Sequence, residues 1–227
     1  MTSYITPELF QFFNELKENN NREWFEANKQ RYEDDVREPL LNFVTDFGVR
    51  LAEISPHYVA DARKSGGSLF RIYRDVRFSK DKTPYKTAAG VQFRHESGKD
   101  VHAPGFYLHL EPGGVFVGIG IWQPDNQTLG KIRDAIVDHS TRWEAAKTDP
   151  AFAAMYTLGG ESLKRAPKGY DPDHPLVEDL KRKDFIASTQ FSEAETCAPD
   201  FIDHFAGACR AATPFMEFLT TAVGLPY

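Results

Sequence analysis

Residues 105–122 read GFYLHLEPGGVFVGIGIW, and apolar residues alternate there with polar or small ones on both sides of the sequence PGG. Alternation with a period of two predicts strands over Gly105–Glu111 and Val115–Trp122. The intervening Pro112–Gly114 favours a tight turn, so the two strands are expected to form an antiparallel hairpin. Three further strands are predicted at 69–78, 90–94 and 185–191.

Helices are predicted on both sides of these strands. Thr6 as N-cap and Pro7 at the first helical position begin a helix that the asparagines at 19–21 end. Two more helices are expected at 22–37 and from Pro39 to Ile54. After the hairpin, helical stretches are expected from 124 or 125 onward and at 142–156, 176–182 and 192–223, with a long loop at 159–175. This order predicts an α+β fold, a single domain over 1–227 with a core at about 6–223, in which a mainly antiparallel sheet packs against N-terminal and C-terminal helices.

Composition narrows the class of protein. The 227 residues are 41% hydrophobic, which is enough for a substantial core, and the net charge is -6. The longest apolar stretch, Val115–Trp122, is too short to cross a bilayer, so no membrane association is expected. The start, MTSYITPELF, lacks the pattern of a secretory signal, and Cys197 and Cys209 form no disulfide framework. We therefore expect a cytoplasmic protein.

The stretch RIYRDVRFSKDKTPYKT, residues 71–87, concentrates positive charge in this acidic chain. Arginines that alternate along one strand face, followed by lysines in a turn, are suited to hold a carboxylate or phosphate. The alternative is a solvated charged face with an internal network of Arg–Asp pairs. Arg74 falls on the apolar face, so a structural ion pair is expected for it. The predicted ligand-binding residues in this stretch are Arg71, Arg77, Lys80, Lys82 and Lys86.

A second basic loop, KRAPKGYDPDHP at 164–175, carries Lys164, Arg165 and Lys168. It resembles DKTPYK in style, because each has a lysine, a proline, another lysine and a tyrosine. One hypothesis is that the two loops converge on one ligand. The other is that they are unrelated surface loops.

Three residues are candidates for proton transfer or orientation of a ligand: Asp75, Tyr85 and His109. His109 is the best acid or base among them, since it titrates near neutrality and lies on a strand, where Tyr107 and Glu111 share its face. A lone strand histidine is, however, more often structural.

A strip of bare backbone is predicted in the hairpin, where Gly118 and Gly120 share a face with Phe116 and Trp122. Glycines allow close approach by a ligand or a packed helix, and helix packing is the commoner reason.

Metal and cofactor sites find little support. Asp171, Asp173 and His174 are explained as turn and N-cap residues, and the histidines at 95, 102 and 109 have no fixed geometry. No phosphate-binding loop, dinucleotide fingerprint, nucleophile elbow or zinc-protease motif is present. We expect no metal and no cofactor.

Several stretches of the chain resemble the uncharacterised bacterial and fungal family called domain of unknown function 2461. The resemblance is carried, in order, by NNREWFEANKQRYE (20–33), RIYRDVRFSKDKTPYKT (71–87), GFYLHLEPGG (105–114), GIGIWQP (118–124) and KRAPKGYDPDHP (164–175). It implies one domain that covers nearly the whole chain. It implies no reaction, cofactor or catalytic residue.

The sequence thus predicts a protein that binds a small anionic ligand, with transformation of that ligand left open. A nucleic-acid-binding module is the runner-up, because cations interleaved with aromatic residues track phosphates and stack bases, although the net acidity opposes it. A non-catalytic scaffold, in which the charged stretch is an internal ion-pair network, is the third interpretation.

Overall fold

A computed structural model describes residues 3–98 and 102–227. Its strands form one antiparallel sheet in the order β1-β2-β3-β4-β6-β5. The hairpin predicted at 105–122 is confirmed as β3 and β4, closed by a hydrogen bond from the Gly114 N–H to the Glu111 carbonyl. β1 and β5 were not predicted, because two or three residues are too short to show alternation. The strands are β1 (Tyr58–Val59), β2 (Ala89–His95), β3 (Gly105–Leu110), β4 (Val115–Ile121), β5 (Thr157–Gly159) and β6 (Phe185–Phe191).

The N-terminal quarter is helical, as predicted, but its division differs. The break expected before Pro39 is absent, because a π-helical turn leads directly into α4. Pro39 has no N–H to donate, and it lies at the start of α4, where the missing donor is tolerated. The elements are α1 (Pro7–Glu18), α2 (Arg22–Ala27), α3 (Lys29–Arg31), the π-helix η1 (Tyr32–Arg37) and α4 (Glu38–Ile54).

The helices after the hairpin lie where the sequence placed them, in shorter pieces. Pro150 begins a new helix inside 142–156, and Pro199 and Pro214 accompany the divisions of 192–223. Cys197 and Cys209 therefore do not share a helix, and both are free thiols. The elements are α5 (Asn126–Asp138), α6 (Ser140–Thr148), α7 (Pro150–Met155), α8 (Val177–Leu180), α9 (Glu193–Thr196), α10 (Phe201–Ala211) and α11 (Thr213–Ala222).

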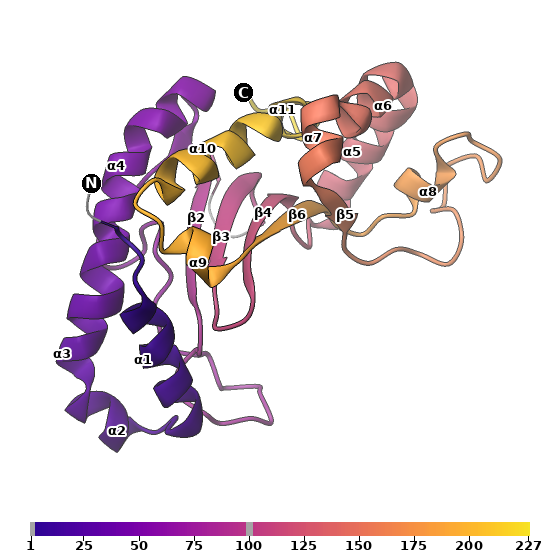
Figure 1. Ribbon diagram of the computed structural model, residues 1–227. Coiled ribbons are helices and arrows are strands. Elements are labelled where there is room, and N and C mark those ends of the chain that lie inside the picture. The colour runs from indigo at the N-terminus through magenta and orange to yellow at the C-terminus, as the bar shows by residue number, and fades with distance from the viewer. Residues whose placement is uncertain (1–2, 99–101) are drawn as a thin grey trace.

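One face of the sheet packs against helices. Phe93 of β2 meets Phe47 of α4 at 4.6 Å and Phe205 of α10 at 5.7 Å between ring centroids, and α11 contacts β4. Figure 1 shows α10 and α11 lying across the strands, with α4 beside them. The predicted α+β class is confirmed: a six-stranded antiparallel sheet with N-terminal and C-terminal helices packed on it.

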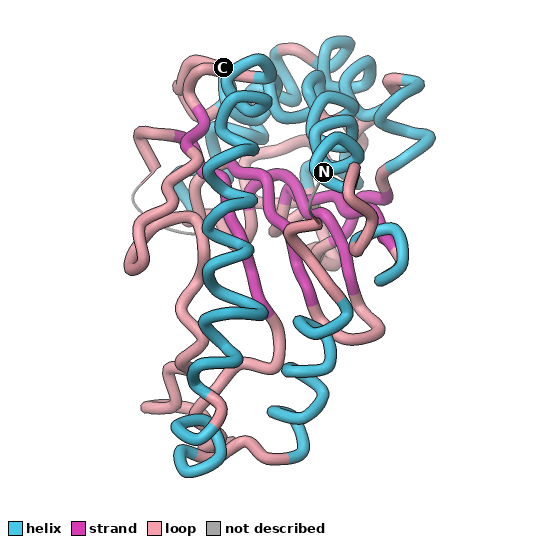
Figure 2. The backbone as a smooth tube through the Cα atoms, turned by 60° about the vertical axis from the view of Figure 1, so that its left-hand side comes forward, coloured by secondary structure: helices cyan, strands magenta, loops and turns pink. Residues whose placement is uncertain are grey.

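The strand predicted at 69–78 is wrong. Residues 71–87, here called the basic arm, form an irregular hairpin whose named β contact is the single bridge between Tyr73 and Tyr85. Phe78, the last apolar residue of that predicted strand, is 95% exposed. The arm extends beyond the ends of β2 and β3 and is drawn as loop in Figure 2, so past Tyr73 it has no neighbouring strand to pair with. Alternation without a pairing partner does not make a strand.

Within residues 3–98 and 102–227, no helix combines the length and the apolar character needed to cross a membrane.

Candidate functional site

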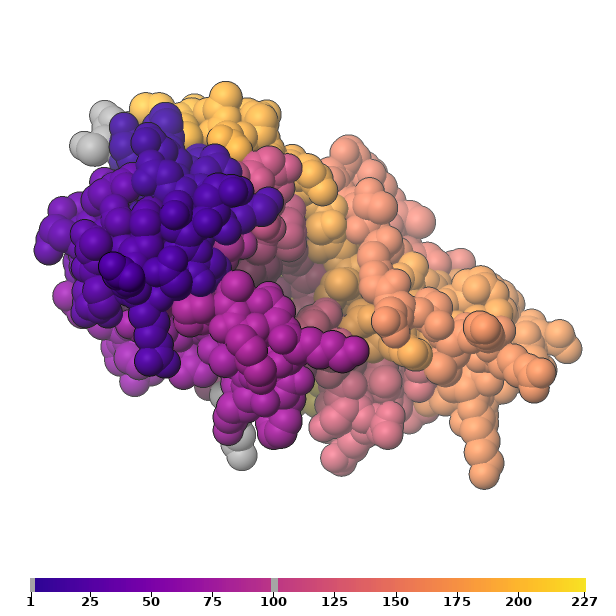
Figure 3. Space-filling view, turned by 90° about the horizontal axis from the view of Figure 1, so that it is seen from below, coloured from indigo at the N-terminus to yellow at the C-terminus, as the bar shows by residue number. Residues whose placement is uncertain are grey.

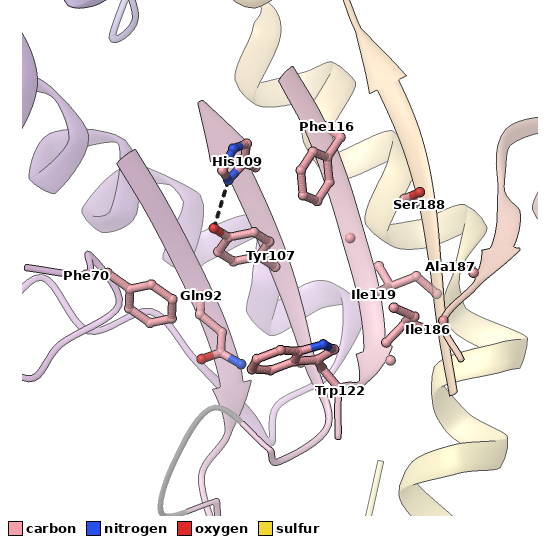
Figure 4. A pocket seen from close by; sticks show the side chains of 15 residues that line it. Phe70, Gln92, Tyr107, His109, Phe116, Ile119, Trp122, Ile186, Ala187 and Ser188 are labelled. Carbon is pink, nitrogen blue, oxygen red and sulfur yellow. Dashed lines mark hydrogen bonds between the residues drawn. The ribbon is translucent and has the colours of Figure 1, made fainter. Parts of the chain in front are cut away.

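The face of the sheet away from the helices carries a hollow of about 640 Å³. Side chains from β2, β3, β4 and β6 project into it, while α10 and α11 lie behind the sheet (Figure 4). Its volume is typical of a site for a small ligand. The lining residues are Phe70, Gln92, Gly105, Tyr107, His109, Phe116, Gly118, Ile119, Gly120, Trp122, Gly159, Gly160, Ile186, Ala187 and Ser188.

The glycine strip of β4 forms part of the floor of this hollow. The expectation that Gly118 and Gly120 admit a packed helix is wrong, because both line the hollow and the helices cover the opposite face. Phe116 and Trp122 rise beside the glycines, and Tyr107 lies opposite Gly118 in the register of β3 and β4. The strip leaves room for a flat apolar body between aromatic side chains.

A chain of three polar side chains follows β3 along the hollow. The Tyr107 hydroxyl lies 3.0 Å from Nδ1 of His109, and Nε2 of His109 lies 3.2 Å from a carboxylate oxygen of Glu111. An ionised carboxylate only accepts, so Nε2 donates to Glu111, and Nδ1 of the tautomer protonated at Nε2 alone accepts from the Tyr107 hydroxyl. Burial, with the Glu111 charge as a second cause, raises the pKa of Tyr107 to about 12. These hydrogen bonds connect Tyr107 and His109, which line the hollow, to Glu111, which does not.

Gly90 of β2 makes the position of the Tyr107 hydroxyl available. A Cβ at residue 90 would lie 2.6 Å from that oxygen and 3.1 Å from the Phe70 ring. A side chain at residue 90 would therefore displace the Tyr107 ring or the Phe70 ring from its present position.

A second cavity of about 550 Å³ adjoins the hollow and shares Phe70, Tyr107 and His109 with it. Lys86 lies on its wall, half-buried, with its ammonium 5.4 Å from the centroid of the Phe70 ring. Among the described residues, no carboxylate forms an ion pair with Lys86. Burial first, and the nearby Arg71 second, lower the pKa of the Lys86 amine. Of the predicted ligand-binding residues, Lys86 is the one that lines a cavity next to His109.

The other charges of the basic arm are mostly paired with one another. Arg74 forms an ion pair with Asp81 at 2.5 Å, so it has a carboxylate partner, although it lies in a loop and not on the apolar face of a strand. Arg77 forms an ion pair with Asp75 at 2.7 Å, and Lys82 donates to the Val76 carbonyl. Part of the arm is therefore the internal network that the sequence left as an alternative.

Two of the three acid–base candidates lie apart from the open face of the sheet. Asp75 is exposed, and hydrogen bonds from Arg77 lower its pKa to about 2, which makes it a weak base. Tyr85 is buried and stacks on Phe25 at 4.1 Å, on the wall of the second cavity. Of the three candidates, only His109 lines both cavities.

The second basic loop does not join this site. Arg165 and Lys168 line a separate groove with Lys181, and Lys164 is exposed. Figure 3 shows the arm and this loop on opposite sides of the hollow between the two halves of the molecule. The two basic loops therefore line different cavities, which gives no support to the hypothesis that they converge on one ligand, and the Tyr170 hydroxyl donates to Asp134 of α5.

Metal-binding groups do not cluster in the described part of the chain. Asp171 accepts from the Asp173 N–H, and His174 accepts from the Leu176 N–H, as turn residues do.

A family model described as Conserved hypothetical protein (DUF2461) matches residues 8–218. The chain belongs to this family. The matched range includes all six strands, the basic arm and both cavities, so the family is defined over the whole site. No curated protein matches the chain.

Proposed function

We propose that the protein binds a small ligand with an apolar body and an anionic group. The body occupies the hollow on the open sheet face, and the anion lies beside Lys86 in the adjoining cavity. The observation that carries this proposal is the half-buried Lys86, which has no carboxylate partner among residues 3–98 and 102–227, on a wall that Phe70 shares with the hollow.

The charges around the second cavity support an anion. The lining of that cavity carries two carboxylates: Asp81, which is paired with Arg74, and Glu111, which accepts a hydrogen bond from His109. Lys17 and Lys86 line the same cavity, and neither forms an ion pair within the described residues. Three cations, Lys17, Arg74 and Lys86, therefore stand against two carboxylates at this cavity, and the excess of positive charge favours a negatively charged group there.

The hollow supports an apolar body with a planar shape. Phe116 stacks on His109 at 4.7 Å, and the glycine floor leaves the space beside these rings open. Such surfaces bind aromatic or other flat groups by burial of apolar area.

With the anionic group beside Lys86, fewer of the predicted ligand-binding residues can contact the ligand. Lys86, with the exposed Arg71 near it, is retained. Arg77 and Lys82 are engaged within the arm, and Lys80 is exposed.

Two fluorescent probes test the proposal. 8-Anilino-1-naphthalenesulfonate and N-phenyl-1-naphthylamine share an aromatic skeleton, and the first carries a sulfonate that the second lacks. Lys86→Met is expected to weaken binding of the sulfonate about fivefold, which corresponds to the ~1 kcal/mol that a half-exposed ion pair contributes. Binding of the neutral probe is expected to change less than about twofold.

Lys80→Met is the matched control, because it removes a lysine of the same arm that lines neither cavity. Equal losses for both probes in Lys86→Met, or the same loss in Lys80→Met, contradict an anion subsite at Lys86.

A nucleic-acid-binding role has one observation in its favour. Phe78 is 95% exposed, and the Arg77 guanidinium lies 5.9 Å from its ring centroid, as at a stacking platform. Such binding would fall steeply with salt and would be lost in Phe78→Ala. The pairing of Arg74 and Arg77 with carboxylates makes this the second choice.

A cytoplasmic location forms part of the proposal, on the evidence of two free cysteines, one of them fully buried.

A further inference from the structure

Lys86 differs from other lysines of the chain in what surrounds its amine. Lys147 is also shielded, but a carboxylate oxygen of Asp179 lies 2.5 Å from its Nζ in an ion pair. Lys181 is likewise paired, with Glu178 at 2.6 Å. Lys86 has the Phe70 ring at 5.4 Å and the Arg71 charge nearby, and in the described part of the chain no carboxylate offsets them.

This setting favours the neutral amine, which is the nucleophilic form. Burial lowers the pKa of the Lys86 amine and repulsion from Arg71 lowers it further. Desolvation and a neighbouring cation are the two devices by which proteins activate lysine toward carbonyl groups.

Groups that transfer protons line the same cavity. The hydrogen-bonded chain of Tyr107, His109 and Glu111 lies on its wall, and His109 Nδ1 and Nε2 are both engaged in it. Formation of an imine needs a proton delivered to the departing oxygen, and the Tyr107 hydroxyl, which ends this chain on the cavity wall, is suited to supply it.

We propose that the amine of Lys86 forms a Schiff base with an aldehyde that carries an anionic group. The neutral amine attacks the carbonyl carbon, and the resulting carbinolamine, once its oxygen is protonated, expels one water to leave the C=N bond. Amine and aldehyde thus give imine and water, with no oxidant or reductant. The inference rests on the proposed function, because it assigns the chemical class of the ligand of that same site.

Pyridoxal 5′-phosphate serves as the probe, since it is a flat aromatic aldehyde with a phosphate. The full-length protein is incubated with it at pH 7, the imine is reduced with borohydride, and peptide mass spectrometry measures labelling at each lysine. Labelling at Lys86 is expected to exceed that at Lys80 and Lys147 by at least about fivefold. Pyridoxal, which lacks the phosphate, is expected to lose most of this preference.

Arg71→Gln supplies a second readout, because it removes the neighbouring cation and leaves Lys86 in place. The preference for Lys86 is expected to fall severalfold in this variant. Labelling of Lys86 no faster than Lys80, with sulfonate binding intact, overturns the Schiff-base inference and leaves the proposed function standing. Preferential labelling by pyridoxal and its phosphate alike, with no preference for the sulfonate probe, overturns the anion subsite instead.

Discussion

Gly120→Ala is expected to destabilise the sheet severely, whereas Gly118→Ala on the same strand face is not. Gly120 has φ of 110°, and it lies opposite Ile186 where β4 pairs with β6. A Cβ at this position would lie 2.0 Å from the Phe185 carbonyl oxygen and 3.0 Å from the Ile186 Cα. At Gly118 the nearest atoms are side-chain carbons of Phe116 and Tyr107, at 3.5 and 3.7 Å.

The size of the effect follows from two costs. A residue other than glycine held at this φ costs about 1–3 kcal/mol. Separating β4 from β6 by the roughly 1 Å that the Cβ needs is overpacking, which costs about 1–3 kcal/mol more. Gly120→Ala should therefore lower the free energy of unfolding by about 4 kcal/mol and Tm by about 10 °C. Gly118→Ala should stay within about 1 kcal/mol of the native protein, because its backbone is unstrained and the added methyl meets ordinary contacts.

Urea unfolding followed by circular dichroism at equal protein concentrations measures both variants. An unchanged m-value allows the midpoints to be compared as stabilities. If Gly120→Ala stays within about 1 kcal/mol of the native protein, or if Gly118→Ala loses as much as Gly120→Ala, then the distinction between a strained glycine and an open one is refuted.

Two further predictions concern charged groups. Asp179→Ala should lower the free energy of unfolding by about 3 kcal/mol in urea, because it leaves the shielded Lys147 without its partner, whereas Glu217→Ala, from an exposed pair, should cost less than about 0.5 kcal/mol. Equal losses of unfolding free energy in the two variants would contradict the argument that burial of the Lys147–Asp179 pair makes its loss costly. The Asp81 carboxylate accepts a hydrogen bond from the Thr83 N–H. This bond first, and the hydrogen bond from Arg74 second, lower the pKa of Asp81 from 3.8 to about 2. Its stabilisation of the arm is therefore present above about pH 4 and is lost as pH falls toward 2, so the protection of the Thr83 amide from hydrogen exchange, taken relative to the intrinsic rate at each pH, should fall over that range in the native protein and not in Asp81→Asn.

The fold could be predicted from the sequence wherever local signals agreed with the tertiary setting. The hairpin of β3 and β4 has alternation, a turn sequence and two strands long enough to show both. The first helix has its proline at the start and asparagine at its end. The strand predicted at 69–78 was wrong because alternation reflects only the spacing of apolar residues and not the presence of a partner strand. Phe78 is apolar at the right spacing and still lies in solvent.

The candidate site was visible in part. Alternation along β3 placed Tyr107, His109 and Glu111 on one face, and the structure joins them by hydrogen bonds. Phe70, within the strand predicted at 69–78, lies on a wall that the two cavities share. No sequence signal predicts this place for Phe70, since it depends on where the segment before the basic arm pairs with β2, through the hydrogen bond from the Phe70 N–H to the Gly90 carbonyl.

By itself, the sequence determined the α+β class, the strand pairing of the hairpin and the family, because these rest on periodicity, turn chemistry and motifs in order along the chain. Only the tertiary structure decided which face of the sheet the helices cover and which cations keep a carboxylate partner. Lys80, Lys82 and Lys86 look alike in the sequence, yet one is exposed, one donates to a carbonyl, and one lies half-buried beside Phe70. The reason is physical, because the reactivity of a charged side chain and its affinity for a ligand depend on its burial and on neighbours distant in the sequence. Neither can be read from the residues next to it in the chain.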